Sequence, residues 1–176
     1  MLKLRVTTSK KLAVTLKRYA EKNIILNEDK NETGLDEIIL HGHRITKDGV
    51  KVDEAKVQAI RSMPAPTVVE GVKRLCGMAQ YMAKFLPNLA ATLEPIRALT
   101  RKDIPFVWSK ECEDAFNTLK KNLSESPCLA LFDSSKEVVI QADISKHGIG
   151  AVPLQEGRPI EYASRALTPS EQHGHR

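Results

Sequence analysis

The spacing of apolar residues separates a helical stretch of the 176-residue chain from a later stretch of strands. Residues 53–126 repeat their apolar positions every three to four residues, as helices do. From residue 128 onward, short apolar runs such as "CLALF" and "EVVIQAD" have the character of strands. Because a mixed start, a helical middle and a sheet-forming end follow one another, the order predicts an α+β fold in more than one module.

The first 50 residues predict one helix and one hairpin. Residues 9–22 carry apolar side chains at helical spacing, with a basic opposite face. Ile38–Leu40 and Arg44–Thr46 read as two strands on either side of a turn near Gly42.

The positive charge of the chain is concentrated in its first 26 residues. The net charge is +5, and this segment holds seven Lys or Arg residues against Glu21 alone. A basic segment favours a polyanionic partner, because neutralising phosphates releases counterions. A solvated amphipathic helix explains the charge equally well.

The sequence disfavours membrane and secreted proteins. No apolar run approaches the roughly 18–20 residues that a membrane span needs, and "MLKLRVTTSKK" lacks the apolar centre of a signal peptide. Cys76, Cys112 and Cys128 are odd in number and widely spaced, which favours free thiols in a reducing compartment. We therefore expect an intracellular protein of the cytoplasm or nucleus, without membrane partners.

Residues 67–88 predict a helix with two different faces. Projected at about 100° per residue, the apolar side chains fall on one side. Gly77 lies mid-helix on the other side, where glycine costs roughly 1 kcal/mol relative to alanine. Either a neighbouring helix packs against Gly77, or a groove or backbone approaches it while Lys73 and Tyr81 bind phosphate or sugar. The polar face contains Glu70, Lys73, Arg74, Gly77, Tyr81 and Lys84.

Capping residues predict three helix starts. Thr67 and Glu70 have the spacing of a capping box. Asn88 is placed to cap the helix that follows. Thr168 and Glu171, with a proline directly after Thr168, form the signature of a last helix start.

The stretch "IQADISKHGIGAVPLQ", residues 140–155, predicts a strand, a turn and a second strand. Asp143 lies at the end of the first apolar run, where a carboxylate could hold a metal ion. Pro153 falls inside the second run, where it would remove a donor of the strand ladder. The residues alone leave open whether this is a catalytic site or only the first part of one.

Four segments, taken in order, resemble the Pol polyprotein of gypsy-type LTR retrotransposons. They are "LHGHRITKDGVKVDEAKVQAIRSMPAPT", "GMAQYMAKFLPNLAATLEPIRALT", "PFVWSKECEDAFNTLKKNLSESPCLALFD" and "GRPIEYASRALTPSEQ". The resemblance implies the end of a reverse transcriptase running into ribonuclease H. The α+β fold would then comprise a palm-end hairpin (1–50), a helical thumb and connection (51–104), and an incomplete ribonuclease H-like mixed sheet with a flanking helix (105–176).

The same resemblance implies roles for the hairpin and the two-faced helix. Gly42 and His43, in "GHRIT", match a hairpin that grips the primer terminus. Lys73, Gly77 and Tyr81 match the positions of a thumb helix that follow the minor groove of the template–primer, which favours the nucleic-acid explanation for Gly77. The expected nucleic-acid-binding residues are Gly42, His43, Lys73, Arg74, Gly77, Tyr81 and Lys84.

Asp143 matches the first metal-binding carboxylate of ribonuclease H and is the candidate catalytic and metal-binding residue. Chemistry of this class uses two metal ions about 4 Å apart, held by several carboxylates. The sequence contains no Asp-Asp pair, and the remaining ribonuclease H acids have no match. The resemblance implies Mg²⁺ in the intact parent, whereas we expect this chain alone to bind none and to be inactive as a polymerase or nuclease.

Three functions are compatible with the sequence. The first is a fragment of an RNA-directed DNA polymerase and ribonuclease H that binds template–primer, either RNA–DNA hybrid or DNA duplex, and contacts other parts of the polyprotein. The second is a non-catalytic retroelement remnant or a co-opted protein-interaction module. The third is an active nuclease, which the shortage of carboxylates disfavours.

Overall fold

The computed structural model describes residues 2–27, 29, 32–102, 104–146, 148–168 and 171, with side chains from Lys10 onward. The chain forms two compact units, residues 1–36 and residues 37–176. The first unit contains α1 (Leu2–Glu21), which includes most of the predicted helix. It ends in a Schellman motif, in which Asn23 has a φ of +53° and the Ile24 amide donates to the Tyr19 carbonyl at 2.9 Å.

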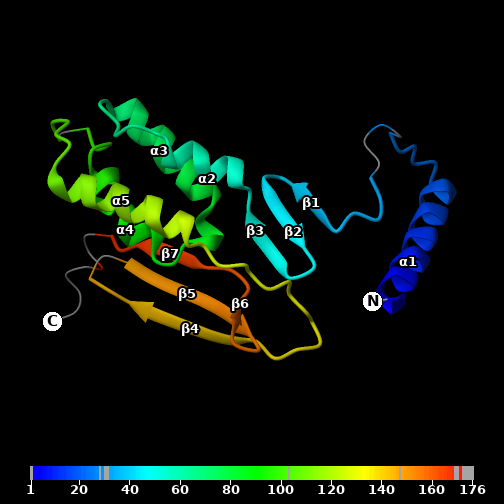
Figure 1. Cartoon of the computed structure of the whole chain (residues 1–176). Helices are drawn as coiled ribbons and strands as arrows, with labels where there is room; N and C mark the ends of the chain where they lie inside the picture. The colour runs from blue at the N-terminus through cyan, green and yellow to red at the C-terminus, as the bar shows by residue number, and fades with distance from the viewer. Residues whose placement is uncertain are drawn as a thin grey trace. The chain divides into compact units, whose positions relative to one another are not determined.

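The second unit begins with three antiparallel strands, β1 (Glu37–Leu40), β2 (His43–Thr46) and β3 (Gly49–Val52), in that order (Figure 1). His41 and Gly42 form the turn between β1 and β2, with φ angles of +48° and +66°. A two-residue turn with positive φ at both positions matches the twist of the strands, which explains the glycine. The predicted hairpin is confirmed. The sequence interpretation omits β3, although Val50 and Val52 alternate with polar residues.

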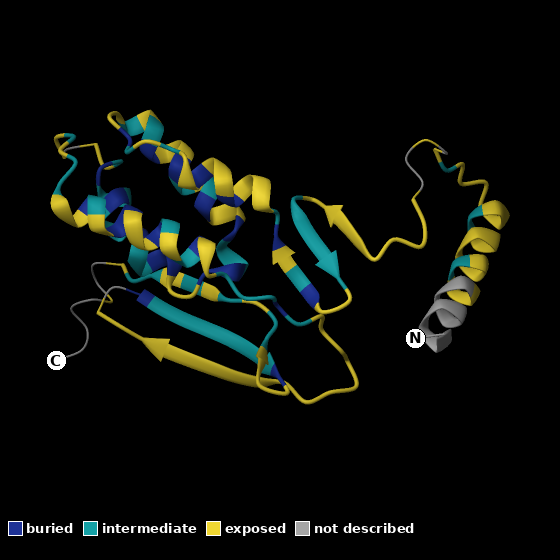
Figure 2. Ribbon diagram, viewed as in Figure 1, coloured by how far each residue is buried: buried dark blue, intermediate teal, exposed yellow. Residues whose placement is uncertain are grey.

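Helices of the second unit share one hydrophobic core with β3. Two of them start at side-chain caps: Asp53 accepts a hydrogen bond from the Ala55 amide at 3.2 Å, and Ser109 accepts one from the Cys112 amide at 3.4 Å. Buried residues lie on the facing sides of these helices (Figure 2). The helices are α2 (Glu54–Arg61), α3 (Val69–Tyr81), α4 (Leu89–Ala98) and α5 (Lys110–Ser124), with a 3₁₀ turn, η2 (Ala83–Phe85), after α3.

The capping box expected at Thr67 and Glu70 is wrong. Val68 occupies the N-cap position in an extended conformation, and no side chain caps α3. Pro66 packs beside Gly71 in the first turn of the helix. The helix therefore starts one residue later than the capping box requires.

The capping signature near the end of the chain is confirmed. The Glu171 carboxylate accepts a hydrogen bond from the Thr168 amide at 2.8 Å, and the Glu171 amide donates to the Thr168 hydroxyl at 3.4 Å. Hydrogen bonds from Arg165 and then from Thr168 lower the pKa of Glu171 to about 2. The predicted Pro169 of this signature lies outside the described residues.

The second sheet is antiparallel throughout its described pairs. β5 pairs with β4 along one side and with β6 and β7 along the other. In Figure 2, β4 is exposed along its whole length, and Ile140 is 71% exposed. The strands are β4 (Val139–Ile144), β5 (Gly148–Gln155), β6 (Arg158–Pro159) and β7 (Ala163–Ala166).

Pro153 lies inside β5, as the sequence predicts, and does not interrupt the pairing with β4. It lies opposite Ile140 of β4, and its carbonyl oxygen accepts a hydrogen bond from the Ile160 amide at 2.9 Å. In an antiparallel strand, the nitrogen and the carbonyl of one residue face the same neighbour. The missing donor therefore faces the gap between β6 and β7, and the ladder with β4 is intact.

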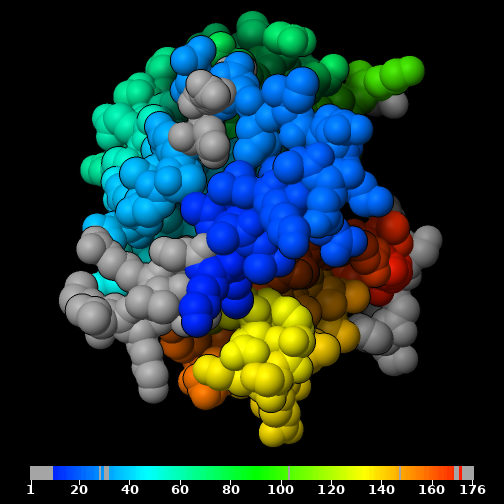
Figure 3. All heavy atoms as spheres, turned by 90° about the vertical axis from the view of Figure 1, so that its right-hand side faces the viewer, coloured from blue at the N-terminus to red at the C-terminus, as the bar shows by residue number. Residues whose placement is uncertain are grey.

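Residues 128–130 join the two sheets. Leu129 and Val50 of β3 exchange backbone hydrogen bonds at 2.8 and 2.9 Å, and the Ala130 amide donates to the Pro159 carbonyl of β6 at 2.7 Å. The side chains that follow, in the segment between α5 and β4, project from the surface (Figure 3, yellow). Among them, Leu131 and Phe132 are more than half exposed.

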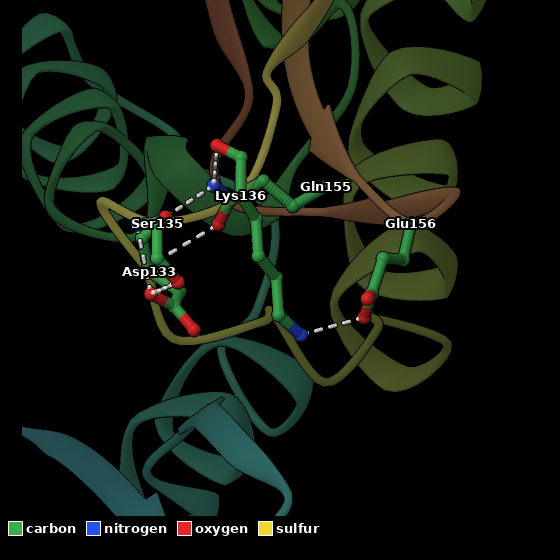
Figure 4. A network of polar contacts seen from close by, with 5 residues as sticks. All are labelled: Asp133, Ser135, Lys136, Gln155 and Glu156. Atoms are coloured by element: carbon green, nitrogen blue, oxygen red, sulfur yellow. Dashed lines mark hydrogen bonds and ion pairs between the residues drawn. The ribbon is translucent and has the colours of Figure 1, made fainter.

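Gln155 holds the loop that leads into β4 (Figure 4). Its side chain is almost fully buried, at 4% exposure. Its oxygen accepts a hydrogen bond from the Asp133 amide at 2.9 Å, and its nitrogen donates to the carbonyls of Asp133 and Lys136 at 2.7 and 3.1 Å. The Lys136 ammonium also pairs with Glu156 at 2.7 Å. The buried amide thus fixes both ends of the loop.

These elements confirm the α+β class predicted from the order of periodicities. The division into residues 1–50, 51–104 and 105–176 stays a prediction. None of the helices in the described part of the chain is long and apolar enough to cross a membrane.

Candidate nucleic-acid interface

Helix α3 presents a buried face and an exposed face, as its sequence predicts. Val72, Leu75 and Ala79 are fully buried in the core of the second unit. The exposed side chains occur between them in sequence, because each residue advances about 100° around the helix. The exposed residues of α3 are Glu70, Lys73, Arg74, Gly77, Gln80 and Tyr81.

Gly77 borders open space instead of a neighbouring helix. A Cβ atom added at Gly77 would meet no heavy atom within 4 Å. The glycine is therefore not needed for close packing inside the described part of the protein. Of the two explanations offered by the sequence, approach by an external molecule is the one that this geometry supports.

The space beside Gly77 is a hollow of about 380 Å³ between α2 and α3. Its lining contains two cationic side chains and no acidic one. Neither Lys56 nor Arg74 forms an ion pair within 4 Å with another residue that the structure describes. The hollow can accept an anionic group such as a phosphate. The lining residues are Lys56, Arg74, Gly77, Met78, Tyr81 and Met82.

Sequence reasoning missed Lys56. The burial of Val57 and Ile60 places Lys56 on the outer side of α2, and this spacing was visible in the sequence. Its place in the same hollow as Arg74 depends on how whole helices pack together, which no local pattern reports.

The predicted hairpin residues meet the end of α3. The Tyr81 hydroxyl donates a hydrogen bond to the His41 carbonyl. The His43 ring stacks on the Tyr81 ring, with centroids 5.6 Å apart and planes 20° from parallel, and its centroid lies 5.4 Å from that of Phe85. A Cβ atom at Gly42 would lie 2.8 Å from the Tyr81 oxygen. The structure thus brings Gly42, His43 and Tyr81 together.

The electrostatic surroundings favour a neutral His43. Burial lowers the pKa of His43 below 6.5, and the charges of Lys84 and His41 lower it further. Its Nδ1 atom is buried without a hydrogen-bond partner among the described residues. Burial also lowers the pKa of Lys84, while Glu161 opposes that shift. Lys84 is half-buried, with its ammonium 5.2 Å from the centre of the Phe85 ring.

Asp143 lies elsewhere, at the exposed end of β4. Its carboxylate accepts a hydrogen bond from the Ile144 amide at 2.9 Å. It borders a hollow of about 330 Å³ whose lining includes Asn88, Gln141 and Tyr162 and no second acidic residue. No group of three or more His, Cys, Asp or Glu side chains that could hold a metal occurs among the described residues. These residues do not fit a two-metal centre, and no catalytic step can be derived from them.

Comparison with known proteins supports the resemblance seen in the sequence. Residues 108–176 match the model of the RNase H-like domain found in reverse transcriptase. Three relatives are Pol polyproteins of Drosophila melanogaster transposons: 412 (33% identical, covering 92% of this chain), 297 (36%, 88%) and gypsy (33%, 89%). This chain spans only 13%, 15% and 16% of their respective lengths.

Solved structures show the same fold at lower identity. The foamy viral protease–reverse transcriptase in complex with RNA/DNA hybrid matches 94% of this chain with a TM-score of 0.78 and 20% identity, over 24% of its own length. The same viral protein in complex with dsDNA matches 79% of this chain with a TM-score of 0.69, over 30% of its own length. The chain is therefore homologous to a segment of gypsy-type retrotransposon Pol polyproteins, and its last part has the RNase H-like fold found in reverse transcriptase.

Proposed function

We propose that this chain is a template–primer-binding segment of a retroelement RNA-directed DNA polymerase and ribonuclease H. The observation that carries the proposal is the open Gly77 on a face whose neighbours Lys73, Arg74 and Tyr81 are exposed. The structural neighbours, which are complexes with RNA/DNA hybrid and with dsDNA, support it.

The chemistry of the α3 face suits the backbone and minor groove of a duplex. A helix without a side chain at Gly77 can approach the groove floor or a sugar closely. Lys73 and Arg74, with Lys56 across the hollow, can neutralise phosphates, and each such contact releases counterions. An A-like RNA–DNA hybrid offers a wide, shallow minor groove with 2′-hydroxyl groups, which fits a helix face better than its narrow major groove does.

The hairpin extends this surface toward the primer end. The Tyr81 hydroxyl lies against Gly42 of the turn, and a neutral His43 contacts the rings of Tyr81 and Phe85. We propose that this turn contacts the sugar–phosphate backbone of the primer strand.

Mg²⁺ belongs in this proposal only to the longer parent protein. Asp143 would supply one ligand of a ribonuclease H centre, and other carboxylates would have to come from outside the described residues. When bound, the metal would activate water and stabilise the leaving oxygen of RNA hydrolysis. The expected activity of the chain alone is binding without cleavage.

Fluorescence anisotropy of the full chain with a labelled RNA–DNA hybrid of about 20 base pairs tests the proposal. We expect affinity to fall steeply with salt, and charge reversal by Lys73→Glu to weaken binding and reduce the salt slope by about one. Lys110→Glu is the matched control, because Lys110 is also exposed but lies on α5.

Two results would contradict the proposal. Absent or salt-independent binding would favour the alternative of a non-catalytic remnant that binds a protein. Magnesium-dependent cleavage of the hybrid's RNA strand, abolished by Asp143→Asn, would show an active nuclease.

A further inference from the structure

The Tyr81 hydroxyl contacts the β1–β2 hairpin and can therefore fix the position of the hairpin relative to α3. It is bonded to the backbone of the His41–Gly42 turn, 40 residues earlier in the sequence. We infer that Tyr81 is a positioning residue: it locks the β1–β2 turn onto the end of α3, so that hairpin and helix face present one continuous surface. Its consequence for nucleic-acid binding rests on the proposed function, whereas the lock itself does not.

Three observations define this lock. The hydroxyl bonds the His41 carbonyl, the ring stacks on His43, and the hydroxyl oxygen occupies the space that a side chain at Gly42 would need. His43 is in turn placed between Tyr81 and Phe85, the second of which is fully buried. The turn is thus connected to the hydrophobic core through aromatic rings.

The contact changes the role that family resemblance implies for Tyr81. Its hydroxyl proton is already donated to the turn, so the hydroxyl is not free to donate to a base or sugar. Tyr81 remains 48% exposed, which leaves part of its ring for contact with a ligand. Its main contribution to binding would therefore come through the hairpin that it places.

Gly42 has two separate reasons to be glycine under this inference. Its φ of +66° favours glycine in any context, and the Tyr81 oxygen is the nearest atom that an added Cβ would meet, at 2.8 Å, ahead of two Tyr81 ring carbons at 3.2 and 3.4 Å. The second reason predicts coupling between the two positions. Gly42→Ala should disturb the hairpin less in a Tyr81→Phe background than in the wild type.

Amide hydrogen exchange of the full chain tests the lock. Tyr81→Phe keeps the ring and removes the hydroxyl. We expect the amides of residues 37–46 to exchange about three to ten times faster, the factor that one net hydrogen bond supports. Amides of the buried face of α3 and of α5 should keep their rates. Tyr162→Phe is the control, because the Tyr162 hydroxyl forms no hydrogen bond with any described residue, and it should leave the hairpin unchanged.

A spectroscopic signature separates positioning from general destabilisation. In NMR spectra, the chemical shifts of the His43 ring protons should stay the same in Tyr81→Phe, which preserves the stack. They should change in Tyr81→Leu, which removes it.

Unchanged hairpin exchange in Tyr81→Phe would overturn the inference. So would weaker hybrid binding by Tyr81→Phe with an unchanged hairpin, because Tyr81 would then contact nucleic acid directly. If the wild type binds no hybrid, the proposed function fails, while the exchange result still decides the lock.

Discussion

The Ser164 hydroxyl of β7 accepts a hydrogen bond from the Ala90 amide at 3.0 Å, and so caps α4 from 74 positions away in the sequence. Asn88, which the sequence predicts as the cap, makes no side-chain capping bond and adopts a left-handed conformation with φ of +52°. A side chain from a strand of the second sheet therefore accepts a hydrogen bond from a free backbone amide in the first turn of α4.

Ser164→Ala should destabilise the second unit by about 1 kcal/mol, the usual cost of losing an N-cap side chain. Urea unfolding of the wild type and variant measures the difference. Asn88→Gly is the control: glycine accepts the positive φ, and no capping bond is lost, so little change is expected. Equal losses for the two variants would show that Ser164 is not the cap.

The features that the sequence predicted correctly are those that depend on residues close together in the chain. The two faces of α3 follow from 100° per residue, and the β1–β2 turn follows from a glycine between two apolar runs. Contacts between distant segments could not be predicted in this way. Ser164 bonds to α4, Lys56 lines one hollow with Arg74, and Tyr81 bonds to the hairpin only because whole elements pack together.

Pro153 also shows that a local pattern does not determine contacts between strands. A proline inside a strand predicts a lost ladder bond, and that rule is correct for the residue alone. Which neighbour faces its nitrogen depends on the register of β5 against β4, β6 and β7. The family resemblance identified Asp143, but no described acidic cluster surrounds it, so its role stays a prediction.

Gly77→Ala should separate stability from binding. Because an added Cβ meets nothing within 4 Å and alanine is the better helix former, the free energy of unfolding should rise by about 0.5–1 kcal/mol. The same methyl group would obstruct a duplex that approaches the helix, so hybrid affinity should fall. Thermal unfolding and anisotropy measure the two effects. A more stable variant with unchanged affinity would show that no ligand approaches Gly77.

Lys56→Glu should weaken hybrid binding in the same direction as Lys73→Glu. The substitution places a negative charge opposite Arg74 in the hollow, where a phosphate is expected. We expect a smaller salt slope, by about one, and little loss of stability, because Lys56 is exposed. Lys110→Glu again controls for net charge. Binding equal to that of the control would exclude the hollow from the interface.

Acidification should loosen the hairpin. Because the pKa of His43 is lowered in the folded protein, the unfolded chain binds the proton more readily. Stability from this group is therefore present above pH 6.5 and is lost as pH falls from 6.5 toward the lowered folded value. Lys84 and His41 carry the charges that face the ring, and the Tyr81 hydroxyl lies beside it.

Hairpin amide exchange between pH 7.5 and 5.5, corrected for intrinsic rates, measures this effect. His43→Phe should abolish the pH dependence while keeping an aromatic ring between Tyr81 and Phe85. His41→Asn is the control, since asparagine tolerates the positive φ at that position. A pH dependence that survives in His43→Phe would assign the effect to another group.

Gln155→Glu should destabilise the chain at neutral pH although the two side chains have nearly the same shape. The glutamine nitrogen donates to the Asp133 and Lys136 carbonyls, and a buried carboxylate would place negative charge against both. Loss of these donations should cost about 1–3 kcal/mol. Burial would raise the pKa of the introduced acid, so its protonated form can donate again. The destabilisation should therefore be smaller at pH 5 than at pH 8.

Urea unfolding at both pH values measures the difference. Glu156→Gln removes only the exposed ion pair with Lys136 and should produce no such pH dependence. If Gln155→Glu were neutral at both pH values, the buried amide would not be what holds the loop.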